Sequence, residues 1–269
     1  MSKTERENPN AMHEITEETQ PDVQKSNSSN KLRNGFIIAQ FIIIIGLLIF
    51  FINHYAEHRR TENTSISSSR YTFGIDVSHY QGRIDWREMR TSHHPIEFVF
   101  IRATMGVDGK DKRFIRNWKS AKDYAYVRGA YHYYRPNENA KKQFENYKSR
   151  VKLVRGDFIP ILDIEKESKY GRKKLREGVL EWLKLAEKEY GKKPMIYTGL
   201  KFYQHILKGH VKGYPLWIAA YSGGKHRVKK EKWTFHQFTE KVRVKGIRAT
   251  VDGNDFKGEI ADLKRMCIQ

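Results

Sequence analysis

Short apolar runs alternate with amphipathic segments from residue 71 onward, and this alternation constrains the fold more than any other feature of the chain. Short apolar runs are typical of buried strands, and longer amphipathic segments are typical of helices. We expect strands at residues 73–77, 98–103, 129–133, 158–164, 195–198, 216–220, 235–238 and 250–252. We expect helices at residues 85–90, 111–125, 137–151 and 173–190, with a further turn or two at 200–207.

The order of these segments predicts an α/β barrel. Five strand–helix units precede three closely spaced strands, and alternating units favour a parallel sheet. Eight strands suggest closure into a TIM-like barrel whose last part is irregular. An open doubly wound sheet is the alternative. However, no Gly-x-Gly-x-x-Gly or Walker loop follows the first strand, so a nucleotide site has no support.

A second feature is an uncharged run of 17 residues at positions 36–52, rich in Ile, Phe and Leu. A helix of this length reaches about 25 Å, near the lower limit for crossing a bilayer. The run is too long for a cleaved signal peptide, and a buried core helix is the remaining alternative. We therefore expect a disordered N-terminus at residues 1–34, a transmembrane signal anchor at 35–53, a polar tether at 54–70 and a folded domain at 71–269.

The chain is strongly basic, because 51 Lys and Arg against 31 Asp and Glu give a formal net charge of +20. Residues 1–70 are balanced, so the whole excess lies in residues 71–269. Such a field attracts nucleic acid, anionic lipid or an acidic cell-wall polymer, although it is equally consistent with a merely solubilising surface. No helix-turn-helix, zinc-finger or RNP-like motif is present, so nucleic acid is not an expected partner.

Metal and thiol chemistry have little support in the sequence. Cys267 is the only cysteine, so an intramolecular disulfide and a cysteine-rich zinc site are both excluded. We expect Cys267 at a frayed C-terminus. His79 and His132 have no Cys or His partner at metal-ligand spacing, which argues against a zinc site. No Gly-x-Ser-x-Gly motif occurs, so a serine nucleophile of that type is not expected.

The strongest local signal is the segment FIPILDIE at 158–165, a buried-strand pattern that ends in two carboxylates. Asp163 and Glu165 are two residues apart, so they point to the same side of a strand. Like charges this close disfavour joint ionisation, so one carboxyl holds a proton while the other stays ionised. Such a pair is typical of retaining glycosidases. A solvated strand end or a pair of helix-capping acids is the alternative.

Further candidate residues lie near other strand ends. Asp76 and Asp252 belong to the first and last strands, which barrel closure places side by side, although Asp252-Gly253 is also a typical turn sequence. Aromatic side chains at the same ends suit the apolar faces of sugars, with ordinary core packing as the alternative. These are Tyr131, Tyr133, Tyr197, Trp217 and Tyr221.

Together these motifs resemble the family 25 glycoside hydrolases, the Chalaropsis-type lysozymes or muramidases, from about Phe73 to Asn254. The similar segments are GIDVSHYQG at 74–82, IDW at 84–86, FVFIRATMG at 98–106, GAYHY at 129–133, LDIE at 162–165, IYTG at 196–199, LWIAAY at 216–221, QF at 237–238 and VDGN at 251–254. Arg102, Met105 and His236 depart from residues that are common in the family.

The resemblance implies an irregular (β/α)5β3 barrel that hydrolyses the β-1,4 bond between N-acetylmuramic acid and N-acetylglucosamine in peptidoglycan. It implies Glu165 as general acid and base, and Asp163 as the residue that orients the substrate's N-acetyl group. An Asp163 nucleophile is the rival mechanism. Asp76 and Asp252 would shape the electric field and bind substrate. Gln237 and the five aromatic residues would bind substrate, and no metal or organic cofactor is implied.

We therefore expect a membrane-anchored peptidoglycan hydrolase with its N-terminus in the cytoplasm. Its catalytic barrel, residues 71–269, would lie on the periplasmic or extracellular side, with peptidoglycan glycan strands as partner and one N-terminal helix in the membrane. Long domains cross membranes largely regardless of flanking charge, so function decides this orientation. The alternative is an anchored peptidoglycan-binding module with little or no catalysis.

Overall fold

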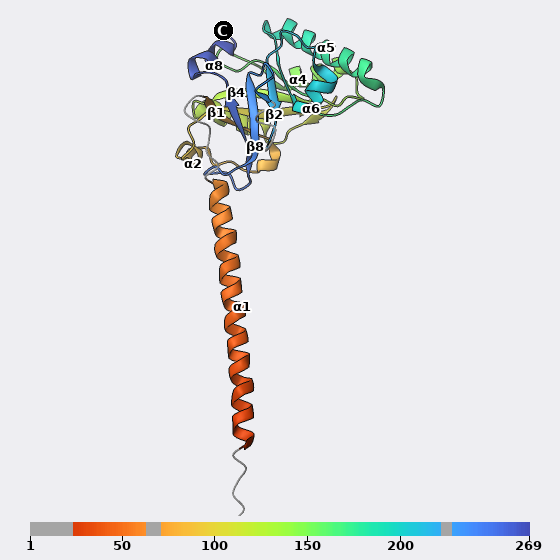
Figure 1. Cartoon of the computed structure of the whole chain (residues 1–269). Coiled ribbons are helices and arrows are strands. Elements are labelled where there is room, and N and C mark those ends of the chain that lie inside the picture. The colour runs from red at the N-terminus through yellow and green to blue at the C-terminus, as the bar shows by residue number, and fades with distance from the viewer. Residues whose placement is uncertain (1–23, 63–70, 222–227) are drawn as a thin grey trace, which may run out of the picture. The chain divides into compact units, whose positions relative to one another are not determined.

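The computed structural model describes residues 24–62, 71–221 and 228–269, and the chain divides into two compact units after Glu57. Most of helix α1 (Gln24–Glu62) belongs to the first unit (Figure 1). Its stretch Arg33–Asn53 has 21 residues and a mean hydropathy of 2.9, and its side chains are exposed. By length and composition this one stretch is able to cross a membrane.

Helix α1 extends beyond the predicted anchor at 35–53 in both directions. Residues 24–34 and 54–62 are helical, where we expected disorder and a tether. Neither segment contains Pro or Gly, so nothing in the backbone breaks the helix at the edges of the apolar run. The rest of the predicted N-terminus, residues 1–23, and of the predicted tether, residues 63–70, lies outside the described residues.

The second unit contains a closed barrel, which confirms the predicted fold class. Its eight strands among the described residues are β1 (Thr72–Val77), β2 (Ile96–Met105), β4 (Val127–Tyr133), β5 (Ile161–Asp163), β6 (Met195–Gly199), β7 (Leu216–Ala219), β8 (Phe235–Val242) and β9 (Val251–Phe256). Neighbouring strands from β1 to β8 run parallel, and β9 pairs antiparallel with both β8 and β1. A two-residue strand, β3 (Gly109–Lys110), extends β2 as a hairpin.

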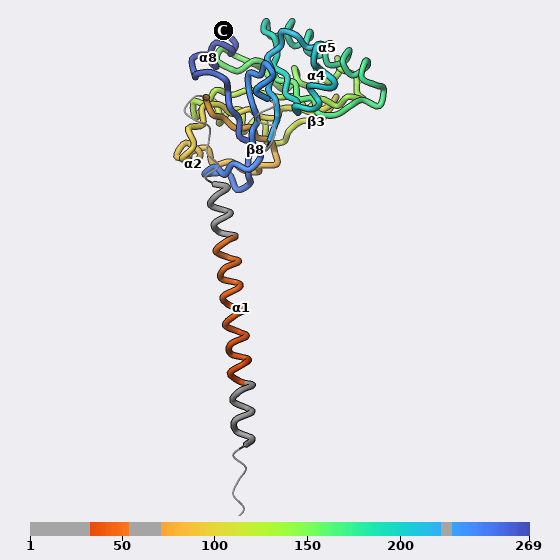
Figure 2. Tube along the Cα trace, in the orientation of Figure 1, coloured from red at the N-terminus to blue at the C-terminus, as the bar shows by residue number. Residues whose placement is uncertain are grey.

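Helices connect the parallel strands at the predicted places, with shorter bounds in most cases. The helical segments are η1 (His79–Gln81), α2 (Trp86–Arg90), α3 (Phe114–Asp123), α4 (Ala140–Arg150), α5 (Gly171–Tyr190), α6 (Leu200–Phe202), η2 (Tyr203–Leu207) and α8 (Ile260–Met266). Helices α4 and α5 pack side by side outside the strands (Figure 2). Helix α8 was not predicted, and it buries Cys267 to 2% exposure. The expectation of a frayed C-terminus at Cys267 was therefore wrong.

Strand residues alternate between two apolar layers, as the period of two requires. On β2, Val99 and Ile101 belong to the layer that includes the buried face of α5, whereas Phe98 and Phe100 belong to a second cluster. The second cluster fills the barrel interior, where the Phe98 and Phe235 ring centroids are 5.2 Å apart. The interior is therefore a packed apolar floor rather than a pore.

Glycine on β1 makes room for this floor. Gly74 lies opposite Phe98 in the β1–β2 pairing. A Cβ atom at Gly74 would lie 2.4 Å from Cδ2 of Phe98, which is far inside van der Waals contact. The Phe98 ring is completely buried and packs against the rings of Phe100 and Phe235, so it could move away only by displacing them. The side-chain volume on β2 therefore requires glycine on β1.

We predict that Gly74→Ala destabilises the protein by about 1–3 kcal/mol, the usual cost of overpacking. This exceeds the smaller gain that alanine brings by restricting the unfolded chain. Gly199→Ala is the matched control, because a Cβ there meets nothing within 4 Å and the backbone φ is −68°. Thermal unfolding of both variants measures the difference. Equal midpoints would contradict the packing argument.

Candidate active site

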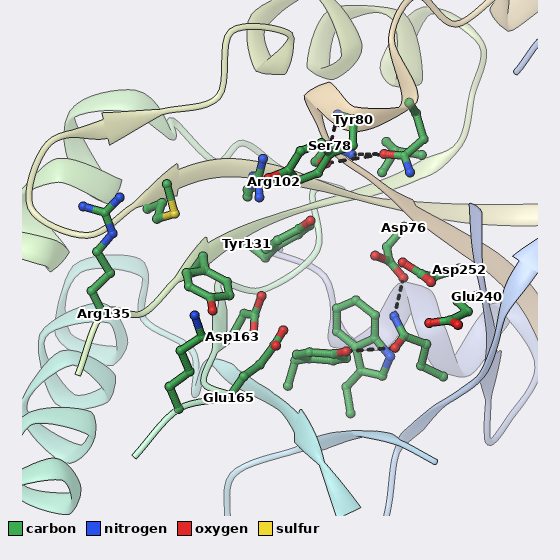
Figure 3. A pocket seen from close by; sticks show the side chains of 18 of the residues that line it. Asp76, Ser78, Tyr80, Arg102, Tyr131, Arg135, Asp163, Glu165, Glu240 and Asp252 are labelled. Carbon is green, nitrogen blue, oxygen red and sulfur yellow. Dashed lines mark hydrogen bonds between the residues drawn. The ribbon is translucent and has the colours of Figure 1, made fainter. Parts of the chain in front are cut away.

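The carboxyl ends of the parallel strands surround an open cleft of about 630 Å³ (Figure 3). All ten residues that the sequence singles out line this cleft: Asp76, Tyr131, Tyr133, Asp163, Glu165, Tyr197, Trp217, Tyr221, Gln237 and Asp252. They come from strands that lie far apart in the sequence. The predicted acids and aromatic residues therefore lie together on one face of the barrel.

The acids continue the inward-facing rows of the strands, directly above the apolar floor. Asp76 lies two residues beyond Gly74 on β1, and Asp163 lies two residues beyond Ile161 on β5. The side-chain period of a strand therefore carries each row from the floor to the cleft. Glu165 follows two residues after the end of β5 and is exposed. Asp163 and Glu165 face the same cleft, as their spacing predicts.

Asp252 reaches the cleft in a different way from the one expected. The predicted strand 250–252 would place Asp252 at a strand end, but β9 is Val251–Phe256 and Asp252 is its second residue. Because β9 is antiparallel to β1, its start lies beside the end of β1, and Asp252 pairs with Asp76. The predicted bounds were wrong, whereas the predicted meeting of the two acids is confirmed.

Two buried amides hold the Asp76 carboxylate. Gln237 Nε2 donates a hydrogen bond to Asp76 Oδ2 at 2.9 Å, and Asn254 Nδ2 donates to the same oxygen at 2.8 Å. Both amides are at most 2% exposed. They come from β8 and β9, so the two strands that close the barrel fix the position of a carboxylate on β1.

The predicted substrate-binding residues extend this network. The hydroxyls of Tyr197 and Tyr221 donate to Gln237 Oε1 at 2.8 and 2.7 Å. Trp217 Nε1 donates to Asn254 Oδ1 at 2.8 Å. Trp217 is buried, whereas Tyr221 is 38% exposed. Buried Trp217 thus orients Asn254, whereas the hydroxyls of Tyr197 and Tyr221 orient Gln237 while the Tyr221 ring remains exposed to the cleft.

Asp76 and Asp252 share a proton. Burial raises the pKa of Asp76 well above its usual range, and the charge of Asp252 raises it further, against the opposing effect of the two amide donors. Burial also raises the pKa of Asp252, to about 6, while a hydrogen bond from Asp76 acts in the other direction. The proton therefore resides on Asp76, which donates it toward the Asp252 carboxylate.

Burial also decides where the proton lies in the second acid pair. Asp163 is 5% exposed, and its Oδ1 has no hydrogen-bond partner among the described residues. Burial raises the pKa of Asp163 well above its usual range, with further contributions from the charge and hydrogen bond of Glu165. In the free protein, burial therefore favours a proton on Asp163, beside the exposed side chain of Glu165.

Sequence reasoning gave no role to Arg102, which lines the cleft, or to Asn254, which is buried below it. Arg102 lines the cleft, and its Nε donates to Asp111 Oδ2 at 3.2 Å. Its charge lowers the pKa of Asp163, although burial has the larger effect. The period of two could have found both residues, because Arg102 follows Phe100 by two positions and Asn254 follows Asp252 by two.

Among the described residues, no group of three or more His, Cys, Asp or Glu side chains could hold a metal ion.

The family model of the glycosyl hydrolases family 25 matches residues 75–247, which contain Asp76, Asp163 and Glu165. The chain belongs to this family. It is accordingly a glycoside hydrolase, and the acid cleft is the candidate active site of this family 25 hydrolase.

Relatives match most of this chain over most of their own length. The uncharacterized protein YegX of Escherichia coli (strain K12) is 38% identical over 216 residues, which are 78% of this chain and 79% of that protein. Lysozyme M1 of Streptomyces globisporus is 30% identical over 205 residues, or 71% of this chain and 69% of that protein.

Solved structures agree with this assignment. A family 25 glycosyl hydrolase from Bacillus anthracis gives a TM-score of 0.66 at 27% identity, covering 74% of this chain and 95% of that one. The bacterial lysozyme from Streptomyces coelicolor gives 0.65 at 27% identity, covering 74% and 98%. The barrel of the family 25 hydrolase is therefore shared with these proteins.

We predict that Asp252→Asn stabilises the protein at pH 7–8 by about 2 kcal/mol, since a raised pKa means that ionisation in the folded state costs free energy. The folded protein binds protons on Asp76 and Asp252 more tightly than the unfolded chain does. The free energy of unfolding therefore falls as pH rises from about 4 through about 6.

Thermal unfolding of the variant between pH 4 and pH 8 measures this effect. The difference from the wild type should vanish near pH 4, where both forms are neutral at this position. Asp123→Asn, at the exposed end of α3, is the matched control and should keep the pH dependence of the wild type. An unchanged pH dependence in Asp252→Asn would contradict the shared-proton assignment.

Proposed function

We propose that this family 25 hydrolase cleaves peptidoglycan at the β-1,4 bond between N-acetylmuramic acid and N-acetylglucosamine, with retention at the anomeric carbon. The observation that carries the proposal is the pairing of buried Asp163 with exposed Glu165 in a cleft that faces the Asp76–Asp252 pair. Two carboxyls in different environments supply the acid and the charge stabiliser that glycoside hydrolysis needs.

Glu165 is the general acid and base in this proposal. Asp163 holds the proton in the free protein, but an N–H of the substrate's acetamide that donates to Asp163 would stabilise its ionised form. The proton then moves from Asp163 to Glu165, which is exposed in the cleft where the glycosidic oxygen would lie. The unpartnered Oδ1 of Asp163 supports this step, because it is a buried oxygen that otherwise lacks a donor.

Bond cleavage then follows a substrate-assisted route. Glu165 gives its proton to the leaving oxygen while the acetamide oxygen attacks the anomeric carbon and the glycosidic C–O bond breaks. The ionised Asp163 stabilises the positive charge of the oxazolinium-like intermediate. Water then attacks the anomeric carbon and gives a proton to Glu165, while the bond between that carbon and the acetamide oxygen breaks and the neutral acetamide re-forms. Two displacements at one carbon give retention. Attack by Asp163 itself is the rival mechanism.

The remaining predicted residues have binding roles in this proposal. Asp252 accepts hydrogen bonds from the sugar, and Asp76 holds Asp252 in place through the shared proton, so that the two acids together set the field across the cleft. The exposed ring of Tyr221 and the half-buried rings of Tyr133 and Tyr197 suit the apolar faces of sugar rings. The route uses the substrate's own acetamide and two carboxyls, so it requires no cofactor.

We also propose that α1 anchors the enzyme in a membrane, with the N-terminus in the cytoplasm and the barrel on the periplasmic or extracellular side. The apolar stretch Arg33–Asn53 supports the anchor. Peptidoglycan carries peptide and lactyl carboxylates, so the basic barrel would hold the enzyme near this substrate.

Glu165→Gln should lower the release of reducing ends from peptidoglycan at least about 100-fold, because a general acid contributes this much or more. The side chain is exposed, so the variant should unfold at the temperature of the wild type. Glu167→Gln is the matched control, since Glu167 is an exposed acid that pairs with Arg172 outside the cleft. Normal turnover by Glu165→Gln would exclude Glu165 as the acid. If the wild type binds peptidoglycan without cleaving it, the protein would instead be a binding module.

Mass analysis of the digested wall should identify the bond that is broken. After reduction with borohydride, we expect the products to end in reduced muramic acid rather than reduced glucosamine. The chemical reason is that a muramidase leaves the new anomeric centre on the muramic acid. Products that end in reduced glucosamine would assign the enzyme to the other β-1,4 bond of the strand.

A further inference from the structure

A second hollow of about 960 Å³ adjoins the catalytic cleft and shares Tyr80 and Gln81 with it. It continues along residues 82–88, the outer side of α3 and residues 246–249. We call it the arginine groove, after Arg83, Arg116 and Arg248, which line it. The catalytic proposal assigns no role to any of these three residues.

The arginine groove has a fixed floor. The Asp85 backbone N–H donates to the Gly246 carbonyl at 2.8 Å, which joins the two segments that form its walls. Gly246 has a φ of +80°, and a Cβ there would lie 2.2 Å from the Asp85 carbonyl oxygen. Ile84 and Ile247, which also line the groove, are buried. The groove is therefore built into the fold rather than created by loose surface side chains.

Positive charge is in excess in this groove. The three arginines are exposed, and none forms an ion pair with another described residue. Two acids line the same groove, Asp85 and Glu88. Asp85 Oδ1 already accepts the backbone N–H groups of Arg87 and Glu88 as the cap of α2. Three guanidinium groups thus line the groove with two carboxylates, a formal excess of one positive charge, and one of the two carboxylates is held in place as the cap of α2.

Tyr80 stands where the groove and the cleft meet. It is 73% exposed, its ring lies 4.2 Å from the His79 ring, and the Arg102 guanidinium lies 5.1 Å from its centroid. Figure 3 places Tyr80 beside Arg102 at the rim of the cleft. The ring of Tyr80 is exposed on one side and contacts His79 and Arg102 on the other. Such a ring is suited to pack against a sugar of a chain that extends from the cleft into the groove.

We propose that the arginine groove binds the stem-peptide carboxylates of the glycan strand whose sugars occupy the cleft. The inference rests on the proposed function, and it adds a binding site for the part of the substrate that is not cleaved. A cleft of about 630 Å³ holds a ligand of limited size, so a polymer continues over the rim. The planar guanidinium group matches a carboxylate with two parallel hydrogen bonds, which makes arginine the suited residue.

The test compares two substrates with the full chain in detergent. One is peptidoglycan strands with their stem peptides, and the other is the same strands after enzymatic removal of the peptides. The combined variant Arg83→Gln, Arg116→Gln and Arg248→Gln should raise KM on peptide-bearing strands roughly five- to tenfold, as three solvent-screened charge contacts would. It should leave kcat on both substrates and KM on the stripped strands unchanged.

The matched control removes three positive charges elsewhere on the barrel. Lys152→Gln, Arg155→Gln and Lys184→Gln change exposed residues that do not line the groove. This control should keep the KM of the wild type on both substrates. An equal rise in KM for both triple variants would overturn the groove in favour of general attraction by the basic surface. An equal rise on stripped and peptide-bearing strands would overturn the assignment to peptide carboxylates.

Failure of the catalytic proposal remains distinguishable from failure of the groove. If the wild type cleaves neither substrate, the proposed function fails, and the groove is then tested by co-sedimentation with insoluble peptidoglycan. The groove variant should bind several-fold less peptide-bearing material than the control triple variant. Binding that matches the control would overturn the groove whether or not the enzyme cleaves.

Discussion

The site depends on the antiparallel insertion of β9 between β8 and β1, which closes the barrel. Closure in this direction places the start of β9 at the carboxyl end of β1, so Asp252 faces Asp76. It also brings the amides of Gln237 and Asn254 to the Asp76 carboxylate. A parallel β9 would carry Asp252 and Asn254 toward the opposite end of the barrel, into contact with the apolar floor.

Because closure forces the acids together, the barrel must compensate for their burial. Burial works against ionisation of Asp76 and Asp163, and the charge of a neighbouring acid works in the same direction. The protein offsets this at Asp76 with two amide donors, but Oδ1 of Asp163 has no partner among the described residues. The uncompensated oxygen is therefore at the pair assigned to catalysis. Functional sites commonly retain such a local cost, which the packing of the rest of the fold must support.

The sequence predicts the parallel part of this barrel well, because β2 and its neighbours are buried on both faces and appear as apolar runs. The same rule fails at β9, whose inward positions include Asp252 and Asn254, so that only its first residues resemble a strand. Helix α8 and the two-residue β3 lack the length that a periodic signal needs. The common direction of Asp163 and Glu165 was predictable from their spacing, whereas their assigned roles came from the family resemblance. The hydrogen bonds that orient Asp76 were not, because they depend on pairing between distant strands.

The net positive charge of the chain and the burial of its cleft acids have opposite effects on the pKa values of those acids, and the effect of burial is the larger one. A formal charge of +20, with Arg102 at the cleft, favours ionised carboxylates. Desolvation nevertheless has the largest effect at Asp76, Asp163 and Asp252, and it raises the pKa of all three. Solvent and salt screen the charges on the outer surface far more than the contacts inside the cleft. The basic surface can therefore attract an anionic polymer without removing the proton that the acid pair must keep.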